Sequence, residues 1–251
     1  GLESDVFLDK GQISRFTYTN IALAGLRLQE FEWVYNFLHR RRERLPEGQR
    51  QGAFSFKSEV NSDSGAALSA AADVDGDGRS DLIVQASSGS FLSVFRNNGD
   101  GTFGQLRTPP LTSAAASCAG ADFNEDGKLD LVAAEYSAGL ISVLPGAGDG
   151  TFGPARSIAS GAGSRILALG DLNCDGHVDV AVGHLGTAQV RVLLGRGDGS
   201  FDSNTLTVAA PGATSALTVA IGDLDGDSRP DLLIGVDGTS PSAQVALNKS
   251  Q

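Results

Sequence analysis

The sequence predicts a mainly β fold, a β-propeller of four-stranded blades that follows a short α-helical segment. Two repeating markers in the 251 residues predict it. The first is a nine-residue acidic loop whose starts lie 49, 49 and 52 residues apart. The second is a phenylalanine that recurs every 49 residues, in phase with the loop. Repeats of about 40 to 50 residues are typical of propeller blades. The phenylalanines are Phe54, Phe103, Phe152 and Phe201.

Each acidic loop carries oxygen-bearing side chains at its positions 1, 3, 5 and 9. So much negative charge in so short a span predicts a bound cation. The first positions match a helix–loop–helix calcium loop, but that loop closes with Glu at position 12, whereas these close with Asp at position 9. The four loops are DVDGDGRSD (73–81), DFNEDGKLD (122–130), DLNCDGHVD (171–179) and DLDGDSRPD (223–231).

Short apolar runs flank every loop. A run such as ILALG leads into a loop, a run such as DVAVGH leaves it, and an alternating run such as VRVLL follows. A Gly-Asp-Gly turn and a run beginning at the marker phenylalanine complete the unit. Runs of this length, rich in Val, Ile and Leu and separated by Gly, Asp and Asn, predict four strands per unit. The predicted division is a helical segment over 1–51 and a propeller over 52–251, with repeats of about 61–109, 110–158, 159–210 and 211–251.

The last repeat lacks its fourth strand, because few residues follow its third run. The segment 52–60 has no blade of its own, yet Phe54 is in phase with the later markers. We therefore expect 52–60 to supply the outer strand of the last blade and so close a four-bladed ring, since unpaired sheet edges invite aggregation. The same pairing between chains would give a head-to-tail filament. A third alternative is that the four units are part of a larger ring.

The stretch ADFNEDGKLDLVAAEYSAGLISVLPGAGDGTFGPA resembles an FG-GAP or VCBS-type repeat, the blade unit of integrin-like β-propellers. The resemblance covers about residues 52–251. It implies that the loop links the first two strands of a blade and holds Ca²⁺ through the side chains at positions 1, 3, 5 and 9 and the backbone carbonyl at position 7. The implied ligands for up to four Ca²⁺ are Asp73, Asp75, Asp77, Arg79 and Asp81; Asp122, Asn124, Asp126, Lys128 and Asp130; Asp171, Asn173, Asp175, His177 and Asp179; and Asp223, Asp225, Asp227, Arg229 and Asp231.

Position 6 of the loop is where the chain must turn sharply. It is Gly in the first three loops but Ser228 in the fourth. A non-glycine residue in a left-handed turn is strained, so the fourth loop departs most from the pattern. The alternative for all four loops is an Asp- and Gly-rich turn without metal. Where metal binds, we expect it to stabilise the blades and to do no catalysis.

The segment 1–51 shares no repeat. Ile21, Gly25 and Leu28 lie on one helical face, and the apolar residues of 31–38 follow helical spacing, which predicts two short amphipathic helices. The arginines of 40–44 are expected at the solvated end of the second helix, with an anionic partner as the alternative. Cys118 and Cys174 are the only cysteines, and either a disulfide or two free thiols fits their positions.

Composition bounds the function. The net charge of −11 lies largely in the loops, and the repeats carry no basic stripe, so nucleic acid is not an expected partner. No run is long and apolar enough for a membrane span. No catalytic or nucleotide-binding motif is present, so we expect no enzyme. The sequence predicts a secreted or cell-surface calcium-binding module for binding, adhesion or assembly, with a protein or glycan ligand. The alternatives are a self-assembling extracellular filament subunit and a carbohydrate-binding or carbohydrate-active accessory module.

Overall fold

The computed structural model describes residues 8–9, 12–13, 66–86, 89–203, 205–238 and 242–249. The chain divides into two units, 1–57 and 58–251. In the first unit, β1 (Leu8–Asp9) pairs antiparallel with β2 (Gln12–Ile13), a contact that the sequence did not predict. The two helices expected within 1–51 and the strand expected at 52–60 lie outside the described residues and stay predictions. The described residues contain no helix, and so none that could cross a membrane.

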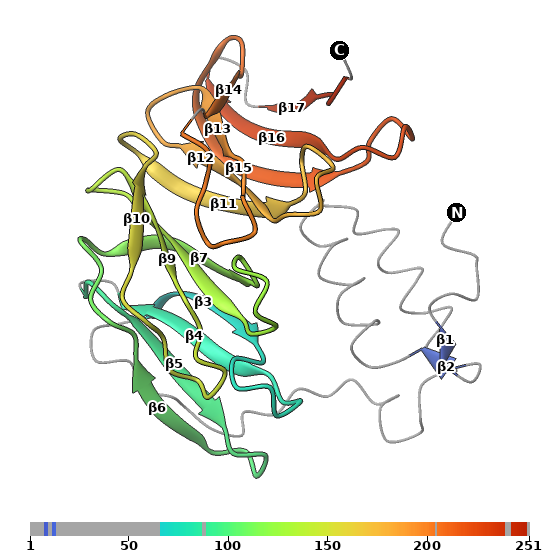
Figure 1. Cartoon of the computed structure of the whole chain (residues 1–251). Helices are drawn as coiled ribbons and strands as arrows, with labels where there is room; N and C mark the ends of the chain where they lie inside the picture. Colours follow the sequence, from blue (N-terminus) through green and yellow to red (C-terminus); the bar gives the residue numbers. More distant parts are fainter. Residues whose placement is uncertain are drawn as a thin grey trace, which may run out of the picture. The chain divides into compact units, whose positions relative to one another are not determined.

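The described strands of the second unit form four antiparallel sheets that follow one another in sequence order (Figure 1). Strand order within each sheet also follows the sequence, because a loop or turn joins each strand to its neighbour. The first sheet contains β3 (Ala66–Ala72), β4 (Asp81–Ala86), β5 (Leu92–Asn97) and β6 (Phe103–Arg107). The second contains β7 (Ala115–Ala121), β8 (Asp130–Glu135), β9 (Leu140–Leu144) and β10 (Arg156–Ala159). The third contains β11 (Ser164–Gly170), β12 (Asp179–His184), β13 (Gln189–Leu193) and β14 (Leu206–Ala209). The fourth contains β15 (Ala213–Gly222), β16 (Asp231–Gly238) and β17 (Ser242–Ala246).

This arrangement confirms a mainly β chain of repeated four-stranded units, with only three strands described in the last. Each acidic loop joins the first strand of a sheet to the second, as the family resemblance implied. The expected outer strand, however, begins at its marker phenylalanine only in β6. Phe152 and Phe201 form isolated bridges to Gly146 and Gly195, and β10 and β14 begin later. In the second sheet Pro154 lies between Phe152 and β10, and proline cannot donate to a strand ladder.

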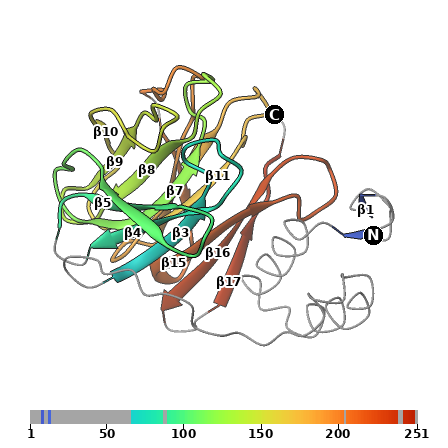
Figure 2. The same ribbon diagram turned by 90° about the horizontal axis from the view of Figure 1, so that it is seen from below.

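The core lies between consecutive sheets. β3 packs on β7, β7 on β11 and β11 on β15, which gives a β-propeller-like arrangement (Figures 1 and 2). Every residue of β8 and β12 is buried, because a sheet lies on each side of these strands. Val94 and Leu131 belong to the cluster between the first and second sheets, Ile141 and Val180 to the next, and Val190 and Ile234 to the third. Burial of this apolar surface holds the row of sheets together.

Candidate metal-binding loops and the pocket beside them

The aspartate at loop position 9 anchors each loop to its sheet. It is the first residue of the second strand and is at most 1 % exposed. One carboxylate oxygen accepts the backbone N–H of loop position 2, and the other accepts a backbone N–H at or beyond the end of the third strand, over distances between 2.7 and 3.0 Å. The sequence predicted these residues as ligands but not as anchors. The residues are Asp81, Asp130, Asp179 and Asp231.

The side chains at positions 1, 3 and 5 shape the loop from inside. In the second loop Asp122 Oδ2 accepts the N–H of Gly127 at 2.8 Å, and Asn124 Oδ1 accepts that of Asp126 at 3.0 Å. Asp126 Oδ1 in turn accepts the N–H of Lys128 at 2.9 Å. Equivalent bonds recur in the other three loops. The oxygen atoms are therefore gathered by the backbone itself, as Asx-type turns gather them.

Two loops bring three carboxylates close enough to share one ion. In the first loop these are Asp73, Asp75 and Asp81, and in the fourth Asp223, Asp225 and Asp227, with candidate ligand atoms within 4.8 Å of one another. Asp77 is absent from the first group and pairs with the Arg79 guanidinium. Asp231 is absent from the fourth. Oxygen-only donor sets of this kind fit Ca²⁺.

At the four ligand positions the second and third loops hold one acidic group fewer than the other two, because position 3 is Asn in both. Asn124 Nδ2 donates to Asp126 at 3.4 Å, and Asn173 Nδ2 donates to Asp175 at 2.8 Å. In these positions the amide nitrogens face the carboxylates, whereas the amide oxygens Oδ1 accept loop N–H groups. Oxygen donors are present in all four loops.

The left-handed turn at position 6 is confirmed. Its φ is +82°, +81° and +90° at the three glycines and +69° at Ser228. A second left-handed position, which was not predicted from the sequence, lies at position 4 of the loop. Position 4 has φ of +56° at Glu125 and +62° at Cys174, where the other two loops have glycine. Since asparagine and aspartate are the non-glycine residues that usually tolerate this conformation, neither side chain indicated it.

The carboxyl pKa values differ between anchors. Burial raises the pKa of Asp130 and Asp179 above the usual aspartate value, against the lowering effect of their backbone hydrogen bonds. At Asp231 the hydrogen bonds from the Asn248 and Leu224 N–H groups prevail, and its pKa is lowered. A bound cation would favour the ionised form of all these groups.

The second and third loops touch each other through side chains. Glu125 Oε1 lies 2.5 Å from His177 Nδ1, and this hydrogen bond is the main cause of the raised pKa of His177. The Gly199 N–H donates to the Phe123 carbonyl at 2.8 Å. A Cβ on Gly197 would meet both Glu125 and His177 below 3.0 Å, so this turn closes over the pair.

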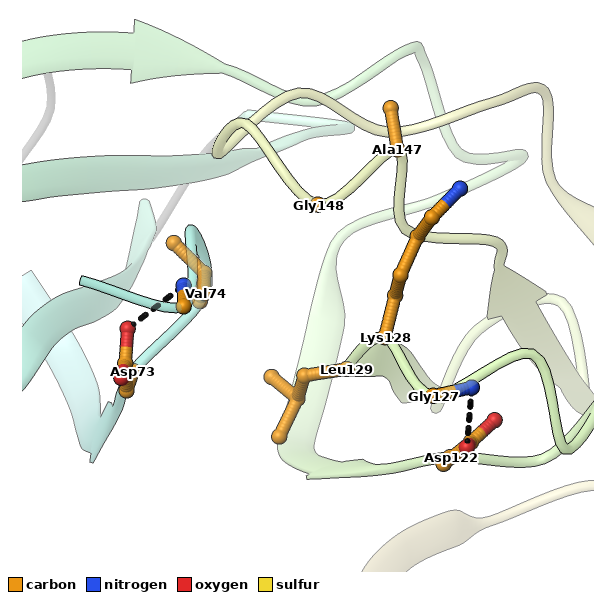
Figure 3. Close-up of a pocket in the computed structure, with 9 residues that line it drawn as sticks. Asp73, Val74, Asp122, Gly127, Lys128, Leu129, Ala147 and Gly148 are labelled. Carbon is orange, nitrogen blue, oxygen red and sulfur yellow. Dashed lines mark hydrogen bonds between the residues drawn. The ribbon is translucent and has the colours of Figure 1, made fainter. Parts of the chain in front are cut away.

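The first and second loops instead leave a pocket of about 450 Å³ between them. Figure 3 shows Asp73 and Val74 on one side and Asp122, Lys128 and the 147–148 turn on the other. The remaining lining residues are Gly76, Gly127 and Leu129. This volume lies in the range of small-molecule sites.

The cysteines take no part in these sites as a pair. Both are free thiols, Cys118 half-buried and Cys174 exposed at position 4 of the third loop. Burial raises the pKa of the Cys118 thiol to about 11, so it stays protonated and is a poor nucleophile. The disulfide alternative is therefore not adopted.

Comparison with known proteins fits these loops and sheets. A family model described as an FG-GAP-like repeat matches three times, over residues 73–133, 122–182 and 171–234. No curated protein matches the chain significantly. Among solved structures 91 chains match. One is a lectin of Agrocybe aegerita with specific recognition of non-reducing terminal N-acetylglucosamine, at 24 % identity and a TM-score of 0.50, over 71 % of this chain and 51 % of the lectin.

The chain thus spans about half the length of that lectin, and the likeness shows the fold alone. The repeat matches carry more weight, because together they extend over residues 73–234 and include all four acidic loops. The chain belongs to the family of FG-GAP-like repeat proteins.

Proposed function

We propose that the chain is an extracellular β-propeller module, stabilised by calcium, that binds a ligand and is not an enzyme. One observation carries the proposal: oxygen-rich loops occupy the same place in four consecutive sheets. Repeats of this family often hold calcium in such a loop. An extracellular location suits these sites, because calcium outside cells is plentiful enough for weak sites to fill.

Calcium would act on stability through charge. The clustered carboxylates of the first and fourth loops repel one another, and a divalent cation at the loop oxygens removes this repulsion. Because an unfolded chain does not preform the sites, binding energy becomes folding energy. A site filled at about 100 times its Kd contributes about 2.7 kcal/mol. The ligand residues are those named above for each loop.

The test is thermal unfolding of the whole chain in excess chelator and in millimolar calcium. About 2.7 kcal/mol from even one site raises Tm by roughly 5–10 °C in a domain of this size. Magnesium is the control, because it demands a stricter geometry and keeps its water, so its effect should be smaller. Equal melting temperatures with calcium and with chelator would remove calcium from the proposal.

The class of ligand is tested separately. The Agrocybe aegerita lectin recognises a terminal sugar, and the likeness to it supports a glycan as the first ligand class to try. A glycan array probed with and without calcium should give calcium-dependent signals. A silent array would leave a protein ligand and the adhesion role.

A further inference from the structure

The interface between the first and second loops and the interface between the second and third loops differ in one feature: the first pair is separated by a pocket, and the second pair is in contact. Position 4 of one loop faces position 7 of the next. Between the second and third loops, Glu125 at position 4 places its carboxylate 2.5 Å from His177 at position 7. Between the first and second loops, position 4 is Gly76 and position 7 is Lys128, and both line the open pocket. The chain therefore supplies a carboxylate at one interface and leaves its place empty at the other.

The residue at position 7 has similar surroundings at both interfaces, because a glycine of the Gly-Asp-Gly turn lies against its side chain in each. Gly148 lies against the Lys128 side chain, where an added Cβ would meet Lys128 Cδ at 3.0 Å, just as Gly197 lies against His177. Lys128 is thus held beside the 147–148 turn, as Figure 3 shows. Its ammonium lies 3.8 Å from Asp126, a loose pair, and its side chain is 46 % exposed. The cation remains accessible to another partner.

We propose that the pocket between the first and second loops binds the carboxylate of an external ligand in the place that Glu125 fills at the next interface. Lys128 pairs with this carboxylate, and the absent side chain of Gly76 provides the room. The inference rests on the proposed binding function and deepens it by naming the ligand chemistry. It needs the loops to hold calcium, because Asp73 and Asp122 line the same pocket and their uncompensated charge would repel an anion.

The affinity of the pocket for two acids and for their uncharged analogues is measured by titration calorimetry in millimolar calcium. Methyl glucuronide against methyl glucoside represents an acidic glycan, and N-acetylglutamate against N-acetylglutamine represents an acidic peptide. Tighter binding of either acid than of its match supports the proposal, and the acid that binds identifies the source. If neither acid binds more tightly than its match, the proposal is overturned.

Variants locate the binding. Gly76→Glu should fill the pocket as Glu125 does and weaken acid binding at least about tenfold, the scale of one lost charge-assisted contact. Gly226→Glu is the matched control, because it adds the same side chain at position 4 of the fourth loop, also at positive φ and with open space around it. The Gly226→Glu variant should bind the acid as tightly as the unchanged protein does. Equal loss in both variants, or in neither, would contradict the assignment.

Opening the second interface gives a gain of function. Glu125→Gly removes the internal carboxylate, and glycine suits its φ of +56°. We expect a second binding site for the same acid, now at His177, and an unchanged stoichiometry would contradict the inference. Adding Lys128→Met to the Glu125→Gly variant should abolish the first site and keep the second. The melting shift with calcium is measured on every variant, so failure of the pocket is distinguished from failure of the calcium-dependent fold.

Discussion

Asp130 illustrates how one residue can serve both the loop and the sheet. Its oxygens accept the N–H of Gly146 at 2.7 Å and of Phe123 at 3.0 Å, in a fully buried position. In Asp130→Asn the amide nitrogen cannot accept, so a buried N–H loses its partner. We expect the free energy of unfolding to fall by about 1–3 kcal/mol in urea, even with chelator present.

The matched control is Asp126→Asn, at a loop position where the side-chain oxygen can keep its bond to the Lys128 N–H. In chelator its effect should stay within about 0.5 kcal/mol, and in calcium it should grow. Equal losses for both variants in chelator would show that position 9 is no special anchor.

The aspartate of the Gly-Asp-Gly turns is held by the residue two positions on. Asp149 Oδ1 accepts both the hydroxyl and the N–H of Thr151, at 2.6 and 2.9 Å, and these bonds lower its pKa. Thr151→Val removes the hydroxyl, so the pKa of Asp149 should rise toward its ordinary value. A depressed pKa stabilises the fold above the ordinary pKa and loses this effect as pH falls through the lowered one. The variant should therefore be destabilised at neutral pH and lose less stability on acidification.

Carboxyl carbon NMR during a pH titration measures this change. Asp198, whose pKa Ser200 lowers in the same way in the next sheet, is the internal control and should not move. An unchanged Asp149 titration in the variant would contradict the role of the hydroxyl.

At this scale the spacing of the acidic residues predicted that carboxylates gather in the loops, and three of them lie together in the first and in the fourth loop. It did not predict the contact of Glu125 with His177. That contact depends on how far apart neighbouring loops stand, and this distance is set by packing between sheets. The anchoring by Asp130 was missed for a similar reason, since its partner Gly146 lies beyond the third strand.

At the scale of the element, the fourth loop is the one that carries a non-glycine residue in the left-handed turn at position 6. Ser228 has φ of +69°, where the other loops have glycine. Ser228→Gly should relieve about 1 kcal/mol and raise Tm by about 2–4 °C. Gly127→Ser is the reverse change at the same position of the second loop, where φ is +81°, and it should lower Tm by a similar amount. Calorimetry in calcium measures both, and shifts of the same sign would contradict the explanation.

The strands next to the loops were the most predictable elements. DLVAAE and DVAVGH begin at an anchor aspartate and continue with residues that are apolar up to a final glutamate or histidine, and both strands are buried throughout. The start of the outer strands was predicted less accurately, because Phe152 and Phe201 each form only an isolated bridge and the strands begin after them. The register shifts between the first two strands of each sheet, such as that between Ala115 and Ser117, left no signal in the sequence. Bulges of this kind add twist that only the packed sheet requires.

At the scale of the whole molecule, β17 pairs on one side only, with β16, among the residues that the structure describes. Val245 and Leu247 are 54 % and 41 % exposed there, within the described residues. In the first sheet the equivalent strand, β5, pairs on its outer side with β6, and Phe103 lies opposite Asn97 and Gln105 opposite Phe95. The N–H groups of Asn97 and Asn248 both donate to their anchor aspartates, which aligns β17 with β5. By this alignment the predicted strand at 52–60 would place Phe54 opposite Asn248 and Phe56 opposite Ala246.

This register gives a cross-linking test of ring against filament. In a chain without Cys118 and Cys174, Phe56→Cys with Ala246→Cys should form a disulfide on mild oxidation, because directly opposed Cβ atoms lie about 4.5–5.5 Å apart. Lys57→Cys with Ala246→Cys is the control, since a shift of one residue turns the side chain to the other face. A cross-linked monomer on a non-reducing gel supports the closed ring, and a ladder of oligomers supports strand exchange. If the two pairs cross-link equally, 52–60 does not pair with β17 in this register, and the closure predicted from the phase of Phe54 is wrong.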